Sequence, residues 1–225
     1  MENPDKRAVV LLSGGLDSVV SLARARTELD IRLILFVNYG QRALERERVA
    51  VIAAANFYGF PFREVNLRWL RDLAPVGMRG DNLSRDVQPE DLNSLDAVWI
   101  PNRNGVLLNV AAAFAEAYEC KYVVTGFNRD EAEDFPDNRR EYAKTVSEGL
   151  AMSTRNGVEV VSFTQELGKP EIIGLGVELG APLSVIWSCY DGGEMMCGRC
   201  ASCLHLKRAL DSLSVEQRPV IHFDS

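Results

Sequence analysis

The chain has 225 residues, 47% of them hydrophobic, with a formal net charge of −7 and a pI near 5.0. This length suits one large domain, or one domain with an appendage. The acidic balance argues against broad binding to a nucleic-acid backbone, which needs clustered Lys and Arg. No apolar segment approaches the roughly 18 residues of a membrane span. The first seven residues carry no secretory apolar region, so we expect a cytoplasmic location.

The first predicted elements flank a glycine-containing turn. An apolar run at 8–12 predicts a buried parallel strand, and the apolar spacing along 19–29 predicts an amphipathic helix. Between them stands Ser-Gly-Gly-Leu-Asp-Ser at 13–18, which places free backbone N–H groups at the positive end of a helix and so suits an anion. It lacks the Gly-Lys-Ser/Thr ending of a Walker loop. The alternative is an ordinary turn in which Asp17 or Ser13 caps the helix.

Strand and helix patterns then alternate along the chain. The predicted strands lie at 31–37, 62–67, 121–126 and 158–163, with a last one at 183–187; the predicted helices lie at 43–58, 107–115, 138–152, 171–179 and 201–213. This order predicts an α/β fold with a doubly wound, mostly parallel sheet.

Two connections stand out. The segment 71–97 contains two prolines and two glycines and is long for a simple connection, which favours either a functional lid or a disordered surface loop. The segment 128–138 is an acidic loop directly after a predicted strand, where ligands of open α/β sheets bind. The alternative for 128–138 is a solvated acidic turn before a helix.

Four of the five cysteines crowd into a short C-terminal stretch, at Cys189, Cys197, Cys200 and Cys203. In a cytosolic chain this clustering favours a metal over disulfides. Four thiolates suit one tetrahedral zinc ion with a structural role. An iron–sulfur cluster and a redox pair remain as alternatives. His205 lies nearby as a competing ligand or, in the simpler interpretation, a surface helix residue. Cys120 is expected to be buried and inert.

Taken in order, these motifs resemble one family over about nine tenths of the chain. The loop at 13–18 resembles that of the ATP pyrophosphatases. With Tyr-Gly-Gln-Arg at 39–42, Pro-Asn-Arg-Asn at 101–104, Thr-Gly at 125–126, Phe-Pro-Asp at 135–137, Lys-Pro-Glu-Ile at 169–172 and the cysteine cluster, the chain resembles the 7-cyano-7-deazaguanine synthases of the queuosine and archaeosine pathway. Two positions depart from the family pattern: Asn102 stands where the family usually has Gly, and Asn138 where it often has Cys.

The resemblance implies an ATP-dependent C–N ligase that converts 7-carboxy-7-deazaguanine and ammonia to the 7-cyano compound through an amide. It implies an ATP-binding domain at 1–188 of the adenine nucleotide alpha hydrolase type, a zinc-binding segment at 189–225 packed on it, Mg²⁺ with ATP, and a homodimer. The expected nucleotide-binding residues are Leu11, Leu12, Ser13, Gly14, Gly15, Leu16, Asp17, Ser18, Val19, Val20, Tyr39, Gln41, Arg42 and Gly126. The expected catalytic residues are Asp17, Ser18, Arg103 and Lys169, and the expected substrate contacts are Arg103, Phe135 and Asp137.

Three other functions stay open at this stage. One is tRNA thiolation or lysidine formation by a related ATP pyrophosphatase, which the acidic balance disfavours. Another is an ATP-dependent paralogue acting on a different acid, which the two departures leave open. The third is a zinc-bearing binding module without enzymatic activity, which is the least favoured because it would not explain the loop at 13–18. For Arg103 and Lys169 the competing interpretations are a surface salt bridge and a surface lysine at a helix start.

Overall fold

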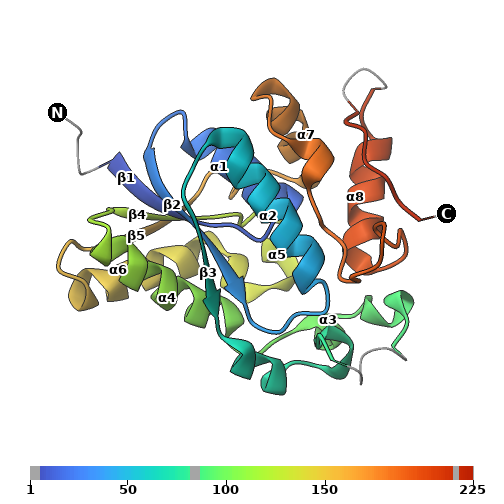
Figure 1. The fold of residues 1–225 in the computed structure, drawn as a ribbon, viewed down its shortest axis with the longest axis horizontal. Helices are drawn as coiled ribbons and strands as arrows, with labels where there is room; N and C mark the ends of the chain where they lie inside the picture. The colour runs from blue at the N-terminus through green and yellow to red at the C-terminus, as the bar shows by residue number, and fades with distance from the viewer. Residues whose placement is uncertain (1–5, 82–86, 215–217, 225) are drawn as a thin grey trace.

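A computed structural model describes residues 6–81, 87–214 and 218–224 (Figure 1). Its helices and strands, in chain order, are β1 (Arg7–Leu11), α1 (Leu16–Ala25), β2 (Asp30–Asn38), α2 (Leu44–Tyr58), β3 (Phe62–Asn66), α3 (Leu95–Val98), α4 (Arg103–Ala117), β4 (Tyr122–Thr125), α5 (Arg129–Asp134), α6 (Arg140–Ser153), β5 (Glu159–Ser162), α7 (Lys169–Glu178) and α8 (Ala201–Asp211). None of the helices in these ranges combines the length and apolarity needed to traverse a bilayer.

The five strands form one parallel sheet in the order β3-β2-β1-β4-β5. Helices cover both of its faces: α1, α2 and α7 pack on one, and α4 and α6 on the other (Figure 1). Burial on both faces explains why the central strands are continuous apolar runs. The predicted doubly wound α/β fold is confirmed.

The chain reverses its winding direction between β1 and β4. From β1 it runs outward through β2 to β3, and it then returns to place β4 on the other side of β1. The loops after β1 and β4 therefore diverge, which opens a crevice at the carboxyl ends of the strands. Gly126, directly after β4, lies so close to α1 that a Cβ there would stand 2.5 Å from the backbone nitrogen of Ser18.

The structure corrects the predicted last strand at 183–187. Leu183–Val185 forms a short 3-10 turn instead, after Pro182. The run is apolar because Leu183 and Ile186 are buried, and Leu183 packs close to Gly176 of α7. A short buried apolar run fits a strand or a packed turn equally well, so the pattern alone did not distinguish them.

The acidic segment 128–138 is also more ordered than the predicted loop. It contains α5, whose first turn is capped by the Asn128 side chain accepting from the backbone N–H of Glu131 at 2.9 Å. Acidic side chains in that turn, Asp130 and Glu131, suit the positive end of a helix. The prediction of a loop here was wrong in its local structure.

Part of the long segment 71–97 packs on the body, and residues 82–86 lie outside the described ranges, so the choice between a lid and a disordered loop stays open. Met78 and Leu92 are buried in the core shared by α1 and α2. The backbone N–H of Gly80 donates to the oxygen of Gly40 at 2.7 Å, which ties the segment to the turn after β2.

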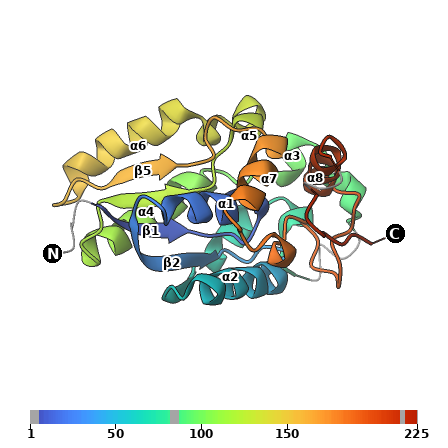
Figure 2. The ribbon, with the colours of Figure 1, turned by 90° about the horizontal axis from the view of Figure 1, so that it is seen from above.

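The C-terminal residues join the same core. The four clustered cysteines and Leu206 of α8 lie in one hydrophobic cluster with residues of α1 and α7. In Figures 1 and 2, α8 lies beside α7 at one end of the molecule. The division into 1–188 and 189–225 stays a prediction; the structure shows that the cysteines and the buried face of α8 pack on the α/β body.

Candidate active site

A cavity of about 530 Å³ opens at the carboxyl ends of β1, β2 and β4, where the winding reverses. The loop at 13–18 forms one part of its wall, and the first residues of α4 and α7 form others. Met78 and Leu95 add a wall from the long segment 71–97, and residues 187–190 close the side nearest the cysteines. The position is the one at which open α/β sheets bind ligands.

The loop at 13–18 has the backbone of an anion site. Gly14 has φ of 83°, in the left-handed region, and a Cβ there would stand 2.8 Å from that of Ala50. The N-cap of α1 is Gly15, which has no side chain, so neither Asp17 nor Ser13 caps this helix as in the simpler interpretation. Instead the Ser13 and Ser18 hydroxyls lie 3.1 Å apart. The N–H of Leu16, the first residue of α1, donates to the Ser188 hydroxyl, whereas those of Asp17 and Ser18 have no capping side chain among the described residues and suit an anion.

Lys169 bridges two carboxylates that come from distant parts of the chain. Its Nζ donates to Asp17 at 2.5 Å and to Glu131 at 2.8 Å. The Lys169 side chain is only 12% exposed, so it is not the surface lysine of the alternative interpretation. Burial opposes the charged form, but the two carboxylates together raise the pKa of Lys169 well above its ordinary value. The ammonium group is therefore permanent at physiological pH.

Asp17 is left with one oxygen that the protein does not use. Its Oδ2 meets Lys169, while its Oδ1 is buried and makes no hydrogen bond to any described residue. Burial, only partly offset by Lys169, raises the pKa of this carboxyl. A buried unpartnered carboxylate oxygen beside an anion loop fits a divalent cation held with phosphates.

Arg103 begins α4 and turns its guanidinium over the ring of Tyr39, 5.6 Å from the ring centroid. Within the described ranges no carboxylate oxygen lies within 4.0 Å of it, so the alternative of a surface salt bridge does not hold. Its Nε donates to the side-chain oxygen of Asn104 at 3.4 Å. Burial raises the pKa of Tyr39 to about 12, which keeps its hydroxyl protonated. A half-buried guanidinium with no carboxylate in direct contact is suited to an anionic ligand.

The cavity lining separates the expected site residues into two groups. Those that line it are Leu11, Leu12, Ser13, Gly15, Asp17, Ser18, Tyr39, Gln41, Arg42, Arg103, Gly126, Phe135 and Lys169. Those that do not are Gly14, Leu16, Val19, Val20 and Asp137. Leu16, Val19 and Val20 are core residues of α1 with at most 1% exposure. Phe135 stacks on Trp99, with ring centroids 6.2 Å apart.

Several lining residues were absent from the expected set. Trp187, Ser188 and Tyr190 come from the connection to the cysteines, and sequence pattern does not place them. Glu47 could have been identified from the sequence. It stands three residues before the buried Ala50 and four before the buried Val51, on the inward face of α2. A charge at a core-facing helical position indicates either a buried partner or a site.

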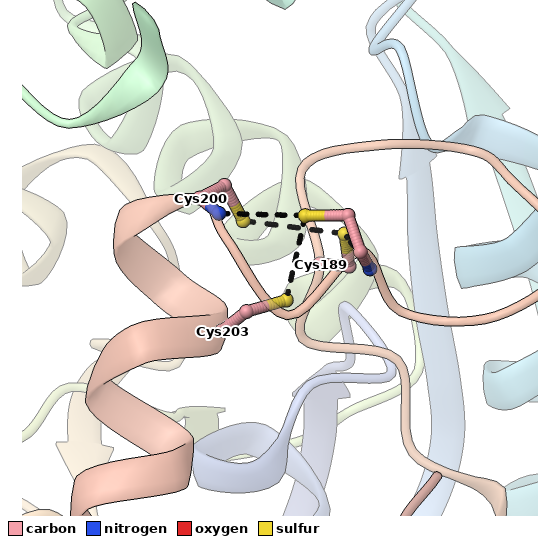
Figure 3. Close-up of side chains that lie close together, drawn as sticks. Cys189, Cys200 and Cys203 are labelled. Carbon is pink, nitrogen blue, oxygen red and sulfur yellow. Dashed lines mark hydrogen bonds between the residues drawn. The ribbon is translucent and has the colours of Figure 1, made fainter. Parts of the chain in front are cut away.

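The four clustered cysteines converge from the loop and the start of α8 (Figure 3). Their Sγ atoms all lie within 4.8 Å of one another, with 4.0 Å between Cys189 and Cys200 and 3.9 Å between Cys197 and Cys203. A single ion with four sulfur bonds of about 2.3 Å needs sulfur atoms about 3.8 Å apart. The donor set therefore fits one tetrahedral metal ion. His205 is exposed and is not part of this group.

The cysteine segment holds the anion loop directly. The backbone N–H of Trp187 donates to the oxygen of Gly14 at 2.8 Å, and the Ser188 hydroxyl accepts from the N–H of Leu16 at 3.2 Å. Cys189, the next residue, is one of the four thiols. The cysteine cluster and the anion loop are therefore connected through the two residues that precede Cys189.

Comparison with known proteins decides the family. The family model described as queuosine biosynthesis protein QueC matches residues 7–214. The chain belongs to the QueC family.

Curated relatives match this QueC-family chain over almost its whole length. The 7-cyano-7-deazaguanine synthase of Pelotomaculum thermopropionicum is 45% identical, covering 93% of this chain and 99% of the relative. The synthase of Carboxydothermus hydrogenoformans is 46% identical, covering 91% and 98%, and that of Methanosarcina barkeri is 40% identical, covering 93% and 96%. The names of these relatives support an enzyme. Among solved structures, NMN synthetase from Francisella tularensis aligns over 98% of this chain and 90% of that chain, with 14% identity and a TM-score of 0.47.

Both departures from the family pattern have a local explanation in the structure. Asn102 has φ of 51°, a left-handed conformation in which Gly is ordinary and Asn is the common replacement. Asn138 is buried, lines the cavity and donates from Nδ2 to Asp137 at 3.2 Å. The first change keeps the backbone that the family's glycine allows, and the second adds a partner for Asp137.

Proposed function

We propose that this protein is an ATP-dependent ligase that converts 7-carboxy-7-deazaguanine and ammonia into 7-cyano-7-deazaguanine through an amide. Membership of the QueC family and the shared name of its curated relatives support the overall conversion. The observation that carries the mechanism is one cavity that joins the glycine turn at the start of α1, the largely buried Lys169–Asp17 pair and Arg103, which has no carboxylate oxygen within 4.0 Å among the described residues.

The chemistry explains why such a cavity is useful. A carboxylate oxygen is a poor leaving group, and transfer of a phosphoryl or adenylyl group from ATP makes it a good one. Ammonia then displaces it and gives the amide. A second activation, on the amide oxygen, allows that oxygen to leave and the nitrile to form. Both steps depend on positioning and charge neutralisation rather than on a protein nucleophile.

Residues of this chain divide these tasks. The loop at 13–18 binds the phosphates through backbone N–H groups and the Ser13 and Ser18 hydroxyls. Lys169 supplies a fixed positive charge beside them. Arg103 binds the carboxylate of the acid or the group being transferred to it, and Phe135 lies against the ring. Asp137 lies outside the cavity lining, whereas its neighbour Asn138 lies inside. For Asp137 to accept the ring N–H groups, the ring would have to reach it past Asn138.

Two metal ions belong to this proposal. Asp17 would hold Mg²⁺ through its unpartnered Oδ1, and the ion would supply further charge neutralisation at the phosphates. Cys189, Cys197, Cys200 and Cys203 would hold one structural zinc ion, since four thiolates leave no open position for water. A cytoplasmic location and a homodimer stay predictions.

The test is mass spectrometry of the small molecules formed from 7-carboxy-7-deazaguanine, ATP, Mg²⁺ and an ammonium salt. We expect the amide and then the nitrile, with ATP consumed in proportion. Consumption of ATP with other acids but neither product from this one would favour the paralogue that acts on a different acid. A product found only on tRNA would favour the tRNA-modifying alternative.

A further inference from the structure

One carboxylate of the cavity has no part in the proposed reaction so far. Glu47 lies near the start of α2 and lines the cavity together with Tyr39 and Gln41. It shares the inward face of the helix with Ala50 and Val51, which are buried. Placing a carboxylate there costs desolvation free energy, so the position calls for a function that offsets the cost.

The Glu47 carboxylate is oriented by a side chain whose own hydrogen bonds are all used. Gln41 donates from Nε2 to Glu47 Oε2 at 2.8 Å and to the backbone oxygen of Val37 at 3.2 Å. Its Oε1 accepts from the N–H of Tyr39 at 2.9 Å. Oε1 of Glu47 makes no hydrogen bond to any residue in the described ranges. One oxygen is therefore fixed, and the other is available to a ligand in the cavity.

Glu47 also differs in charge from the other buried carboxylates of the site. Asp17 and Glu131 share the ammonium of Lys169, whereas no cationic nitrogen of the described chain lies within 4.0 Å of Glu47. The charged and titratable groups that face it are Arg103 of α4 and Tyr39. The cavity thus holds a carboxylate that has a hydrogen-bond donor but no counter-ion.

The protonation of Glu47 is poised near neutral pH. Burial raises the pKa of its carboxyl to about 7, against the opposing effects of the Gln41 hydrogen bond and the Arg103 charge. A group with a pKa near the working pH is suited to proton transfer.

We propose that Glu47 binds ammonium ion in the cavity and accepts its proton, so that free ammonia forms beside the activated carboxyl carbon. This inference rests on the proposed function. Ammonium has no lone pair and cannot attack. Once one proton has moved to Glu47, the nitrogen lone pair forms the C–N bond, and the bond from carbon to the phosphorylated or adenylylated oxygen breaks with its electron pair. Loss of a second proton from nitrogen leaves the neutral amide.

The surroundings of Tyr39 support this assignment. The Arg103 guanidinium lies over its ring, and the Glu47 charge acts on its hydroxyl. Arg103, which suits an anionic carboxyl group, and Glu47, which suits a cation, therefore both lie near Tyr39. Attack by an amine on a carboxyl needs these two reactants held next to each other.

The test compares two nucleophiles in Glu47→Gln. Glutamine keeps an acceptor for Gln41 but cannot take a proton. Hydroxylamine is uncharged at pH 7 and attacks without first losing a proton, so it gives a hydroxamate where ammonia gives the amide. We expect kcat/KM for ammonium to fall by about 10²-fold. The KM for ATP, the KM for the acid and the rate with hydroxylamine should stay near those of the wild type.

The matched control is Glu45→Gln on the same helix, whose side chain is 81% exposed and pairs with Arg48 on the surface. It should behave as wild type with both nucleophiles. Equal losses with both nucleophiles in Glu47→Gln would overturn the proposal and indicate that Glu47 accepts an N–H of the deazaguanine ring or acts only in structure. An unchanged ammonium reaction would overturn it as well. A wild type that forms neither amide nor hydroxamate would refute the proposed function itself.

Discussion

The anion loop and the cysteine loop meet at the same cavity, yet they are held in place by different means. The anion loop at 13–18 lies between a central strand and a buried helix, and a close glycine contact with α2 fixes its path. The cysteine loop has no regular secondary structure between the 3-10 turn at Leu183–Val185 and α8, and its thiols converge on a point suited to one metal ion.

The difference shows how stability and chemistry are distributed in this site. The sheet supplies the anion loop whenever the core is formed, because burial of apolar side chains drives it. We expect the cysteine loop to depend also on a bound metal, because metal binding to clustered thiolates contributes directly to folding stability. Trp187 and Ser188 hydrogen-bond to the anion loop. Loss of the proposed metal should therefore displace these two residues and lower the rate of the reaction at the anion loop.

The largest expected effect is on the cysteine loop. Cys200→Ser removes one of four ligands, and loss of a structural metal destabilises by on the order of 4 to 5 kcal/mol. We expect a lower Tm and loss of the one zinc ion per chain, measured by calorimetry and elemental analysis. Cys120→Ser is the matched control, because Cys120 is buried outside the cluster and bonds only weakly to the oxygen of Tyr118. Equal Tm values for the two variants, or iron with sulfide in the wild type, would contradict the prediction.

The next effect separates chemistry from stability on the anion loop. Asp17→Asn removes the charge that pairs with Lys169 and the proposed metal ligand, and such a contact is worth roughly 10² to 10³ in kcat. Ser18→Ala should act in the same direction. We expect ATP turnover to fall while Tm changes little, measured with Asp30→Asn, on the surface pair with Arg32, as control. Full activity in both loop variants would remove this loop from the chemistry.

A smaller effect is expected at Arg103, the guanidinium proposed to bind an anionic ligand. Arg103→Lys keeps the charge but loses the planar guanidinium, and a hydrogen bond to a charged group is worth about 1.5 to 3 kcal/mol. The KM for the carboxylic acid should rise by roughly tenfold to a hundredfold, with a smaller change for ATP. Steady-state kinetics with each substrate varied in turn would test this; a rise confined to ATP would place Arg103 at the nucleotide instead.

Replacing Glu47 with glutamine should stabilise the fold by an amount that depends on pH. Its folded-state pKa of about 7 lies above the ordinary 4.5, so the ionised group destabilises the fold above pH 7, and this cost disappears as the pH falls below 4.5. Glu47→Gln should therefore raise the free energy of unfolding by up to about 3 kcal/mol at pH 8 and leave it nearly unchanged at pH 4. Urea unfolding at the two pH values measures the difference, and the same gain at both would indicate that burial of charge is not its cause.

The smallest effect concerns the left-handed residue before Arg103. Asn102→Gly should be close to neutral, and Asn102→Ala should destabilise by about 1 kcal/mol, because alanine tolerates positive φ poorly. Thermal unfolding of the pair isolates the backbone from the side chain. If glycine is as costly as alanine, the Asn102 side chain matters more than its conformation.

The central part of this fold could be predicted from local patterns in the amino-acid sequence. Continuous apolar runs identified the buried strands, and their alternation with helices identified a doubly wound sheet, because both patterns are local consequences of burial. The loop at 13–18 and the cysteine spacing were readable for the same reason, since each motif carries its chemistry within a few residues. The short apolar run at 183–187 was misread because strand and packed turn bury the same side chains.

Only the tertiary structure decided which distant groups share the cavity. Lys169 meets Asp17 across 152 positions of the chain, and Glu47 meets the cavity because α2 packs beside the anion loop. Asp137, predicted on the strength of its motif, lies outside the lining while its neighbour Asn138 lies inside. Such placements follow from how helices and loops pack around the sheet, and side-chain direction at a loop is set by those contacts rather than by local pattern.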